Sequence, residues 1–247
     1  MITKKGIVLV VSILTSIILS MAFQDVWAEG VNLNPSYAQR NVGGKVRMHI
    51  QMTGATELLS MGIKVTFPPE LLQVISASKN KSVWRFAELE PDPLAYSPEI
   101  EIDNTNGVVK MIGGRLAPGV SGNILLGWII FQCSSTNTGS ASVSVSLANP
   151  SPYNNFVKQD GTVSDGSITF AGANICIVSA NACEGDFDGN GYVTGIDYGR
   201  FRNAYGSSFP SDKYDPAADF DANGYITGID YGVFRADYGR TNCPKCF

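Results

Sequence analysis

Histidine and the motifs of common enzymes are nearly absent from this chain of 247 residues. The single histidine, His49, stands between Met48 and Ile50 and is expected on the exposed, polar face of a strand, where histidine is seldom a catalytic base. No H-E-x-x-H zinc motif, G-x-S-x-G nucleophile motif or glycine-rich phosphate loop occurs. We therefore expect that the chain is not an enzyme.

Charged residues are also scarce, at 16% of the chain, and the formal net charge is −4. A nucleic-acid partner needs a basic patch, so this mild acidity argues against one. Acidic residues gather in one proline-rich stretch, which we expect to be a solvated loop, with a glycosidase pair as the alternative. These residues are Glu88, Glu90, Asp92, Glu99, Glu101 and Asp103.

Five cysteines occur, a number that suits an oxidising compartment. Cys133 stands alone in an apolar strand and is expected to be a buried, unreactive thiol. A terminal C-x-x-C also occurs in redox and metal sites, but a thioredoxin-type site needs a βαβ setting that this sequence does not show. We expect the other four cysteines to be disulfide candidates of undetermined connectivity, namely Cys176, Cys183, Cys243 and Cys246.

The N-terminus has the pattern of a secretory signal peptide over residues 1–28. Lys4 and Lys5 precede an uncharged apolar run over residues 7–23, and "VWA" offers small residues for cleavage after Ala28. The alternative is an uncleaved membrane anchor, because the run is longer than a usual signal segment; no later segment is apolar enough to span a bilayer. The sequence thus predicts a secreted protein, or a cell-surface protein if the segment is retained.

Residues 29–172 are expected to form an antiparallel β-sandwich. "KVRMHIQM", "MGIKVTF" and "SVSVSL" alternate apolar and polar residues between turns rich in Gly, Pro and Asn. "ILLGWIIFQC", residues 124–133, is apolar at nearly every position, so both faces of that strand are expected to be covered. Roughly eight or nine such strands without helical periodicity predict two packed sheets.

This pattern resembles a cohesin domain over residues 30–172. "GIKVTFPPELLQVISAS", residues 62–78, is similar to the cohesin strand that ends in a proline turn and returns through an "LL-x-V" segment. "GGKVRMHIQM" precedes it, and "GVVKMIGG", "GNILLGWIIFQC", "VSLANPS" and "DGTVSDGSITF" follow in cohesin order. The resemblance implies a jelly-roll-like sandwich. Carbohydrate-binding modules share the architecture, and the candidate stacking residues for that alternative are Trp84, Trp128, Tyr96 and Tyr153, of which Trp128 is expected in the core.

The C-terminal region repeats one acid-rich loop after 33 residues, as "DFDGNGYVTGID" and "DFDANGYITGID". Oxygen-bearing residues at alternate positions, followed by a glycine for the sharp turn, suit Ca²⁺, which takes about six to eight oxygen ligands. We therefore predict two calcium ions. The candidate ligands are Asp186, Asp188, Asn190, the Tyr192 carbonyl, Thr194 and Asp197, and in the second copy Asp219, Asp221, Asn223, the Tyr225 carbonyl, Thr227 and Asp230.

Each loop departs from the EF-hand pattern, since it ends in Asp and no helical pattern leads into it. Aromatic residues predict an exiting helix after each loop, because they recur at i, i+3 and i+7: Tyr198, Phe201 and Tyr205, then Tyr231, Phe234 and Tyr238. Loop plus exiting helix, over 186–206 and 219–239, resembles the F-hand repeats of type I dockerins. The resemblance implies a small all-α module over residues 184–247, after a linker at 173–183, whose two copies pack their aromatic stripes together and gain stability from calcium.

The dockerin resemblance also implies the residues that contact a cohesin. The family's contact positions, ten and eleven of each loop and one helical turn later, fall on Gly195, Ile196, Arg202, Gly228, Ile229 and Arg235. Gly-Ile stands where many dockerins have a Ser-Thr type pair, which leaves the partner open, and the alternative is that both isoleucines face the module's own core. If the ends of the module meet, as its symmetry suggests, Cys183 pairs with Cys243 or Cys246.

These resemblances imply a secreted, non-catalytic binding or scaffolding protein. Cohesins and dockerins commonly serve extracellular polysaccharide-degrading assemblies, so the expected partners are cohesin- or dockerin-bearing proteins, a second copy joined head to tail, or a polysaccharide. A carbohydrate-binding module with a dockerin tether is the main alternative, and a glycoside-acting enzyme is the least favoured. Because the two repeats are so alike, one cohesin is expected to bind the module in either of two orientations.

Overall fold

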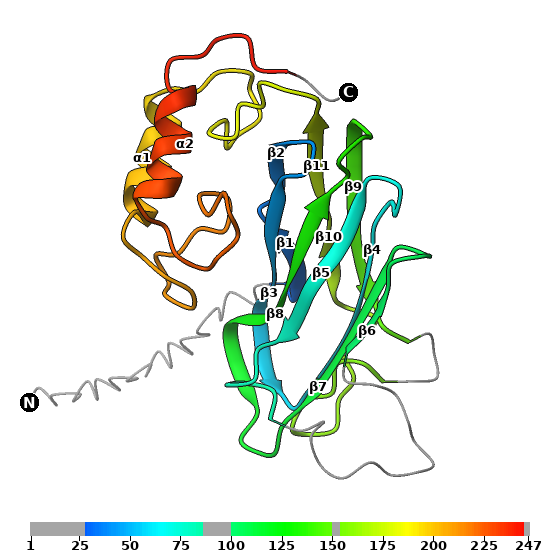
Figure 1. Cartoon of the computed structure of the whole chain (residues 1–247). Coiled ribbons are helices and arrows are strands. Elements are labelled where there is room, and N and C mark those ends of the chain that lie inside the picture. Colours follow the sequence, from blue (N-terminus) through cyan, green and yellow to red (C-terminus); the bar gives the residue numbers. More distant parts are fainter. Residues whose placement is uncertain (1–27, 86–99, 150–153, 245–247) are drawn as a thin grey trace, which may run out of the picture.

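A β-sandwich and a small helical module make up the part of the chain that the computed structural model describes, residues 28–85, 100–149 and 154–244 (Figure 1). Within these ranges, no helix is long and apolar enough to cross a membrane. Residues 1–27 of the expected signal peptide lie outside them.

The first sheet runs β10-β1-β3-β8-β5 among the described residues. Its centre is the long antiparallel pair of β3 and β8, and β1 pairs with β10 in parallel. Its strands are β1 (Gly30–Asn34), β3 (Lys45–Leu58), β5 (Leu72–Lys79), β8 (Val120–Cys133) and β10 (Thr169–Ala171).

The second sheet runs β2-β11-β9-β4-β7-β6 in the same part of the chain. Neighbouring strands are antiparallel except for β2 and β11. Its strands are β2 (Tyr37–Asn41), β4 (Ser60–Thr66), β6 (Ile100–Asp103), β7 (Val108–Gly114), β9 (Gly139–Leu147) and β11 (Ala173–Val178).

The two parallel pairs arise where the first and last strands of the sandwich change sheets together. Pro35 and Ser36 separate β1 from β2, and Gly172 separates β10 from β11, so both segments continue from the first sheet into the second. Proline has no N–H to donate, which favours the end of a ladder at that point. The sandwich expected from the sequence is therefore confirmed, with parallel pairing added to an otherwise antiparallel fold.

The core lies between the sheets and is built from the alternate residues of each strand. In β3, Val46, Met48 and Ile50 are fully buried. Their neighbours Arg47 and His49 point to the opposite face and are also buried, because the C-terminal module covers them. One long strand thus faces the sandwich core on one side and the interface between the two parts on the other.

The C-terminal module, residues 184–244, contains α1 (Gly195–Ala204) and α2 (Gly228–Asp237), which lie side by side in Figure 1. Each helix starts from a threonine N-cap, Thr194 or Thr227, that forms a capping box with the Asp three residues later. The rings of Phe201 and Phe234 stack between the helices with centroids 4.9 Å apart. Helix propensity is weak in these glycine-containing segments, so capping and this packing hold them.

Two expectations about the module require correction. The predicted linker, residues 173–183, begins as strand β11, whose Ile175 and Ile177 are buried in the sandwich, so only residues 179–183 connect the two parts. The aromatic stripes are not wholly internal either: Phe201 and Phe234 are buried, but the tyrosines on either side of them are exposed, namely Tyr198, Tyr205, Tyr231 and Tyr238. A buried tyrosine hydroxyl needs a hydrogen-bond partner, so a tyrosine without one stays at the surface.

A disulfide between Cys183 and Cys243 joins the start of the module to its end. Cys176 is buried in β11, and Cys246 lies outside the described residues. Cys133 is buried and free, and burial raises the pKa of its thiol to about 11, which agrees with an unreactive thiol.

Candidate metal centres and interaction surface

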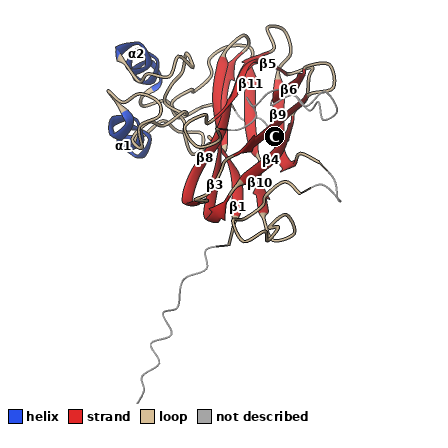
Figure 2. Ribbon diagram, turned by 90° about the horizontal axis from the view of Figure 1, so that it is seen from below, coloured by secondary structure: helices blue, strands red, loops and turns tan. Residues whose placement is uncertain are grey.

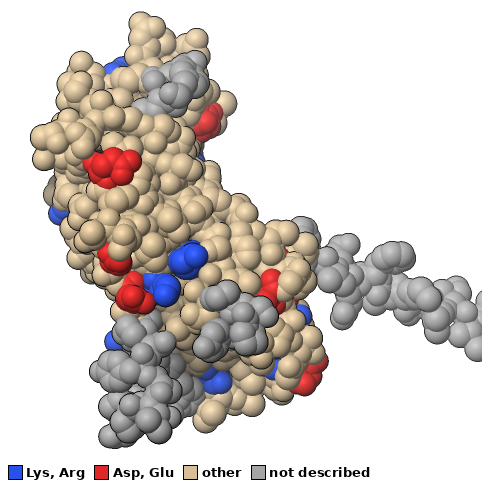
Figure 3. Space-filling model, turned by 90° about the vertical axis from the view of Figure 1, so that its right-hand side faces the viewer, with Lys and Arg blue, Asp and Glu red and all other residues tan. Residues whose placement is uncertain are grey.

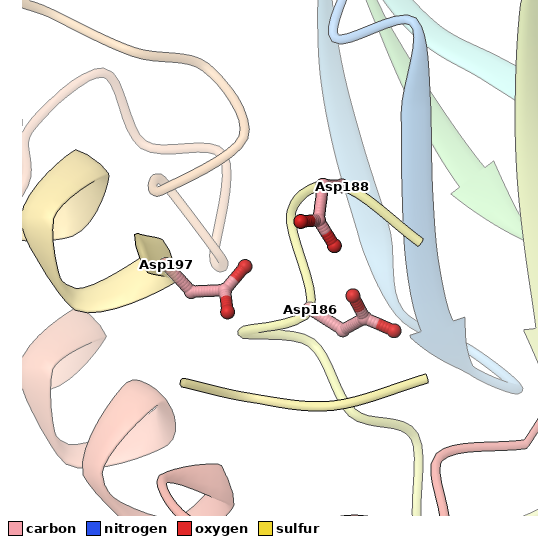
Figure 4. Close-up of side chains that lie close together, drawn as sticks. All are labelled: Asp186, Asp188 and Asp197. Carbon is pink, nitrogen blue, oxygen red and sulfur yellow. The ribbon is translucent and has the colours of Figure 1, made fainter. Parts of the chain in front are cut away.

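Three carboxylates converge in the first acid-rich loop. Asp186 and Asp188 come from the loop and Asp197 from the first turn of α1, and their side chains surround one small space (Figure 4). In each of the two loops, one oxygen from each of the three aspartates lies within 4.8 Å of the others. The second set consists of Asp219, Asp221 and Asp230.

The backbone of each loop folds around its first aspartate. Asp186 accepts from the N–H of Asn190 at 3.1 Å and of Gly191 at 2.9 Å. Gly191 adopts φ +93°, a conformation that side chains with a Cβ rarely take, so the glycine at position six is required by the turn. The second loop repeats this arrangement, with Asp219 accepting from Asn223 and Gly224.

The last aspartate of each loop serves both the loop and the helix. Asp197 accepts from the N–H of Phe187 at 3.0 Å and of Thr194 at 2.8 Å. Thr194 in turn accepts from the N–H of Ile196, so its hydroxyl acts as the helix cap. The side chains of Thr194 and Thr227 are therefore already hydrogen-bonded within their own repeats.

Because the first aspartate of each loop is buried, its charged form is disfavoured. Burial raises the pKa of Asp186 to about 6, and the nearby Asp188 and Asp197 add to the effect. Burial likewise raises the pKa of Asp219. A cation bound among the three oxygens would offset this repulsion, and a donor set made only of oxygen suits a hard ion such as Ca²⁺. The residues present fit calcium in both loops.

The predicted partner-binding residues are exposed on α1 and α2. Ile196 and Ile229 are 74% and 66% exposed, so the alternative that they face the module's own core is wrong. Arg202 and Arg235 are also exposed, and a Cβ on Gly195 or Gly228 would meet no atom within 4 Å. We call this surface, together with the four exposed tyrosines, the helix face.

Sequence reasoning did not assign the four tyrosines to this surface. Tyr198 packs against Tyr238, and Tyr205 against Tyr231, each pair with ring centroids 6.1 Å apart across the two helices. Two equivalent aromatic pairs thus flank the buried phenylalanines. Their regular spacing was visible in the sequence, but spacing alone does not separate a buried phenylalanine from an exposed tyrosine.

The two described residues of the proposed sugar-stacking platform do not form an open surface. Trp84 is fully buried, and Trp128 is half-buried with its ring 4.8 Å from that of Phe209. Tyr96 and Tyr153 lie outside the described residues. The two described tryptophans therefore form no open platform.

The acidic stretch is described only at its end. Glu101 lies 3.6 Å from Lys110, and the Asp103 carboxylate accepts from the N–H groups of Thr105 and Asn106 in a turn. Glu88, Glu90, Asp92 and Glu99 lie outside the described residues. Glu101 and Asp103 belong to strand β6 and not to the expected loop, because they pair with β7, and both carboxylates have local structural partners.

His49 is buried, contrary to the exposed position expected from the sequence. It is only 4% exposed and packs between Phe209 and Tyr214 of the C-terminal module. Burial, and to a lesser extent Arg47, lowers its pKa to about 4. On the face shown in Figure 3, charged side chains of both signs are scattered, with no broad area of one sign.

Comparison with known families identifies the C-terminal repeats. Residues 184–234 match the dockerin type I domain, which confirms the dockerin interpretation of this region. No curated protein matches the chain by sequence.

Solved structures similar to the chain include cohesins. One is the seventh ScaB type I cohesin of Pseudobacteroides cellulosolvens, at 14% identity over 62% of this chain and 94% of that one, with a TM-score of 0.46. Another is CaCohA2 of Clostridium acetobutylicum, at 15% identity over 62% and 94%, with a TM-score of 0.46. A non-cellulosomal cohesin of the archaeon Archaeoglobus fulgidus gives 15% identity over 61% and 91%, with a TM-score of 0.44. Because these TM-scores are below 0.5, the cohesin-like interpretation rests on the strand pattern and the two-sheet fold.

Proposed function

We propose that this chain, whose residues 184–234 form a type I dockerin module, is a non-catalytic binding protein that attaches to a cohesin-bearing partner through calcium-loaded repeats. The observation that carries the proposal is the pairing of two oxygen-lined loops with one open helix face. Calcium would supply the positive charge that holds each loop to the start of its helix, and the helices then present the face.

The helix face has the composition of a recognition surface. Tyrosine and arginine are enriched at energetically important positions of protein interfaces, and here four tyrosines and two arginines are exposed on the same two helices as two exposed isoleucines. None of these side chains belongs to the module's buried core, of which Phe201 and Phe234 are members. A partner of matching shape, such as a cohesin, would bury an apolar surface that is otherwise exposed to water.

Secretion and a place in extracellular polysaccharide-degrading assemblies belong to the same proposal. The pattern of residues 1–28 and the Cys183–Cys243 disulfide both support export into an oxidising compartment. A second copy of the chain is a further candidate partner, because each copy carries both a dockerin and a cohesin-like sandwich, and head-to-tail contacts of this kind form open chains unless the geometry closes.

Binding of the full chain to an immobilised type I cohesin, and to an immobilised second copy of itself, would test this function. We expect saturable binding in millimolar Ca²⁺ and none in EDTA, with the helical circular dichroism signal lost in EDTA while the strand signal persists. If the helical signal and the partner binding are both insensitive to EDTA, calcium-dependent recognition is wrong.

A further inference from the structure

The sandwich contacts the dockerin module through its calcium loops and the segment between the repeats. Figure 2 shows loops, not helices, between α1, α2 and the strands. In the first loop, a Cβ on Gly189 would come within 3.2 Å of the Tyr37 ring of β2. The helices lie farther from the strands than these loops do, and the residues of the helix face remain exposed beside the docked sandwich.

The second loop meets the sandwich through a charged residue. Arg47 of β3 places its Nε 3.6 Å from Oδ2 of Asp219, and its terminal nitrogen donates to the carbonyl of Ala222 at 3.1 Å. The Arg47 side chain is 9% exposed and that of Asp219 is not exposed at all. Since water screens buried pairs poorly, this pair interacts more strongly than a surface ion pair does.

The two loops therefore differ in surroundings although their ligands are the same. Asp219 accepts from the Tyr214 hydroxyl, lies beside the Arg47 guanidinium and accepts from its own loop backbone. Asp186, at the same position of the first loop, accepts from its own loop backbone, and no ion pair to it occurs among the described residues. Only two of twelve loop positions differ, and neither is a candidate ligand.

We propose that Arg47 makes the two calcium sites unequal, by tying the second loop to the sandwich and lowering the affinity of that loop for calcium. The inference rests on the proposed calcium binding. A guanidinium and a divalent cation at one carboxylate repel each other, so each weakens the binding of the other. By linkage, calcium in the second loop weakens the Arg47 contact by the same free energy. The second site thus couples calcium binding to docking of the module, whereas the first site has no ion pair of this kind among the described residues.

Calcium titration of full-length variants in which one site is disabled tests the coupling. Asp188→Ala leaves the second site to be measured, and Asp221→Ala leaves the first. In the Asp188→Ala background, we expect Arg47→Gln and Arg47→Met to raise the calcium affinity by about threefold to tenfold, the size expected when one charge near a divalent ion is removed. In the Asp221→Ala background, Arg47→Gln should leave the affinity unchanged.

Two further variants separate charge from packing. Arg47→Lys keeps the positive charge and should give no gain in affinity at the second site. His49→Gln removes a neutral docking contact with Phe209 and Tyr214 and should also give no gain. If neither neutral Arg47 variant raises the affinity of the second site, or if His49→Gln raises it equally, the inference is overturned while calcium binding stands. If neither background binds calcium, the proposed function and the inference fail together.

Discussion

The burial and the pKa of His49 are set by residues from a distant part of the chain. Its ring stacks with Tyr214, 5.5 Å away between centroids, and meets the edge of Phe209 at 5.2 Å. Burial and the neighbouring Arg47 favour the neutral ring, and Asp215 opposes them weakly, so the pKa falls to about 4. The neutral His49 ring therefore packs on aromatic rings of the C-terminal module, while the neighbouring Arg47 makes the charged contact with that module.

The depressed pKa of His49 predicts a pH-dependent stability. In the unfolded chain the ring takes up a proton below about pH 6.5, whereas in the folded chain it does so only near pH 4. The contribution of His49 is therefore present above about pH 6.5 and is lost as the pH falls toward 4, by at most about 3 kcal/mol. Urea unfolding of the wild type and His49→Gln at pH 7 and pH 4.5 would measure it.

His49→Gln should be less stable than the wild type at pH 7, and the difference between their free energies of unfolding should shrink at pH 4.5. A difference that stays the same at both pH values would contradict the assigned pKa.

The sequence could not show this burial. Alternation correctly places His49 on the face of β3 that points away from the sandwich core, and for an isolated sandwich that face would meet water. The residues that cover it, Phe209 and Tyr214, lie about 160 positions later, in a segment with no periodic pattern. Only the packing of one module on the other determines such contacts.

At the scale of elements, each repeat joins a loop to a helix through one shared aspartate. Asp197 accepts from the loop at Phe187 and from the helix cap at Thr194. The spacing of the twelve-residue pattern predicted that the three aspartates of each loop would come together, because loop geometry is local and repeats with the sequence. The helix boundaries also follow from local signals, since the Thr caps and the Asp three residues later can be read directly.

The first aspartate of the loop and the threonine cap are expected to respond differently to substitution. Asp186→Ala removes a charged candidate ligand and should lower the calcium affinity of the first site on the order of a hundredfold or more. Thr194→Ala removes the cap and should cost about 1 kcal/mol of stability, with a much smaller change in calcium affinity. Calcium titration and thermal unfolding would separate the two. Thr227→Ala is the matched control in the second repeat, and a loss of affinity from Thr194→Ala as large as that from Asp186→Ala would show that Thr194 is a ligand.

At the scale of the whole molecule, the sandwich occupies the loop side of the dockerin and leaves the helix face open. The approximate two-fold relation of the repeats places Ile196 with Arg202 and Ile229 with Arg235 in equivalent positions on that face. The sequence predicted this symmetry from the repeat itself. It did not predict which side of the module the sandwich would take, because that choice depends on the shapes of two folded surfaces.

The symmetry predicts redundant binding. Ile196→Asp with Arg202→Ala should leave cohesin affinity within about threefold, because the partner can use the other repeat after a half-turn, whereas adding Ile229→Asp and Arg235→Ala should reduce it more than about a hundredfold. Surface-immobilised cohesin would report both. Ile75→Asp, at a half-exposed isoleucine of β5, is the matched control. Complete loss of binding with the first pair alone, while both calcium sites remain filled, would show one composite interface.

The bond between Cys183 and Cys243 also sets how the molecule carries mechanical load. Tension applied between the sandwich and residue 243 passes across the bridge, so the intervening segment, with a sequence separation of 60, stays slack. Pulling along the chain in this way extends the connection without stretching either loop. After reduction, the same pull would draw out that segment, to a contour length of about 200 Å. The bridge thus shields the two repeats from a pull on the ends of the module, whereas a load that enters through the helix face acts inside the bridged segment and reaches the repeats directly.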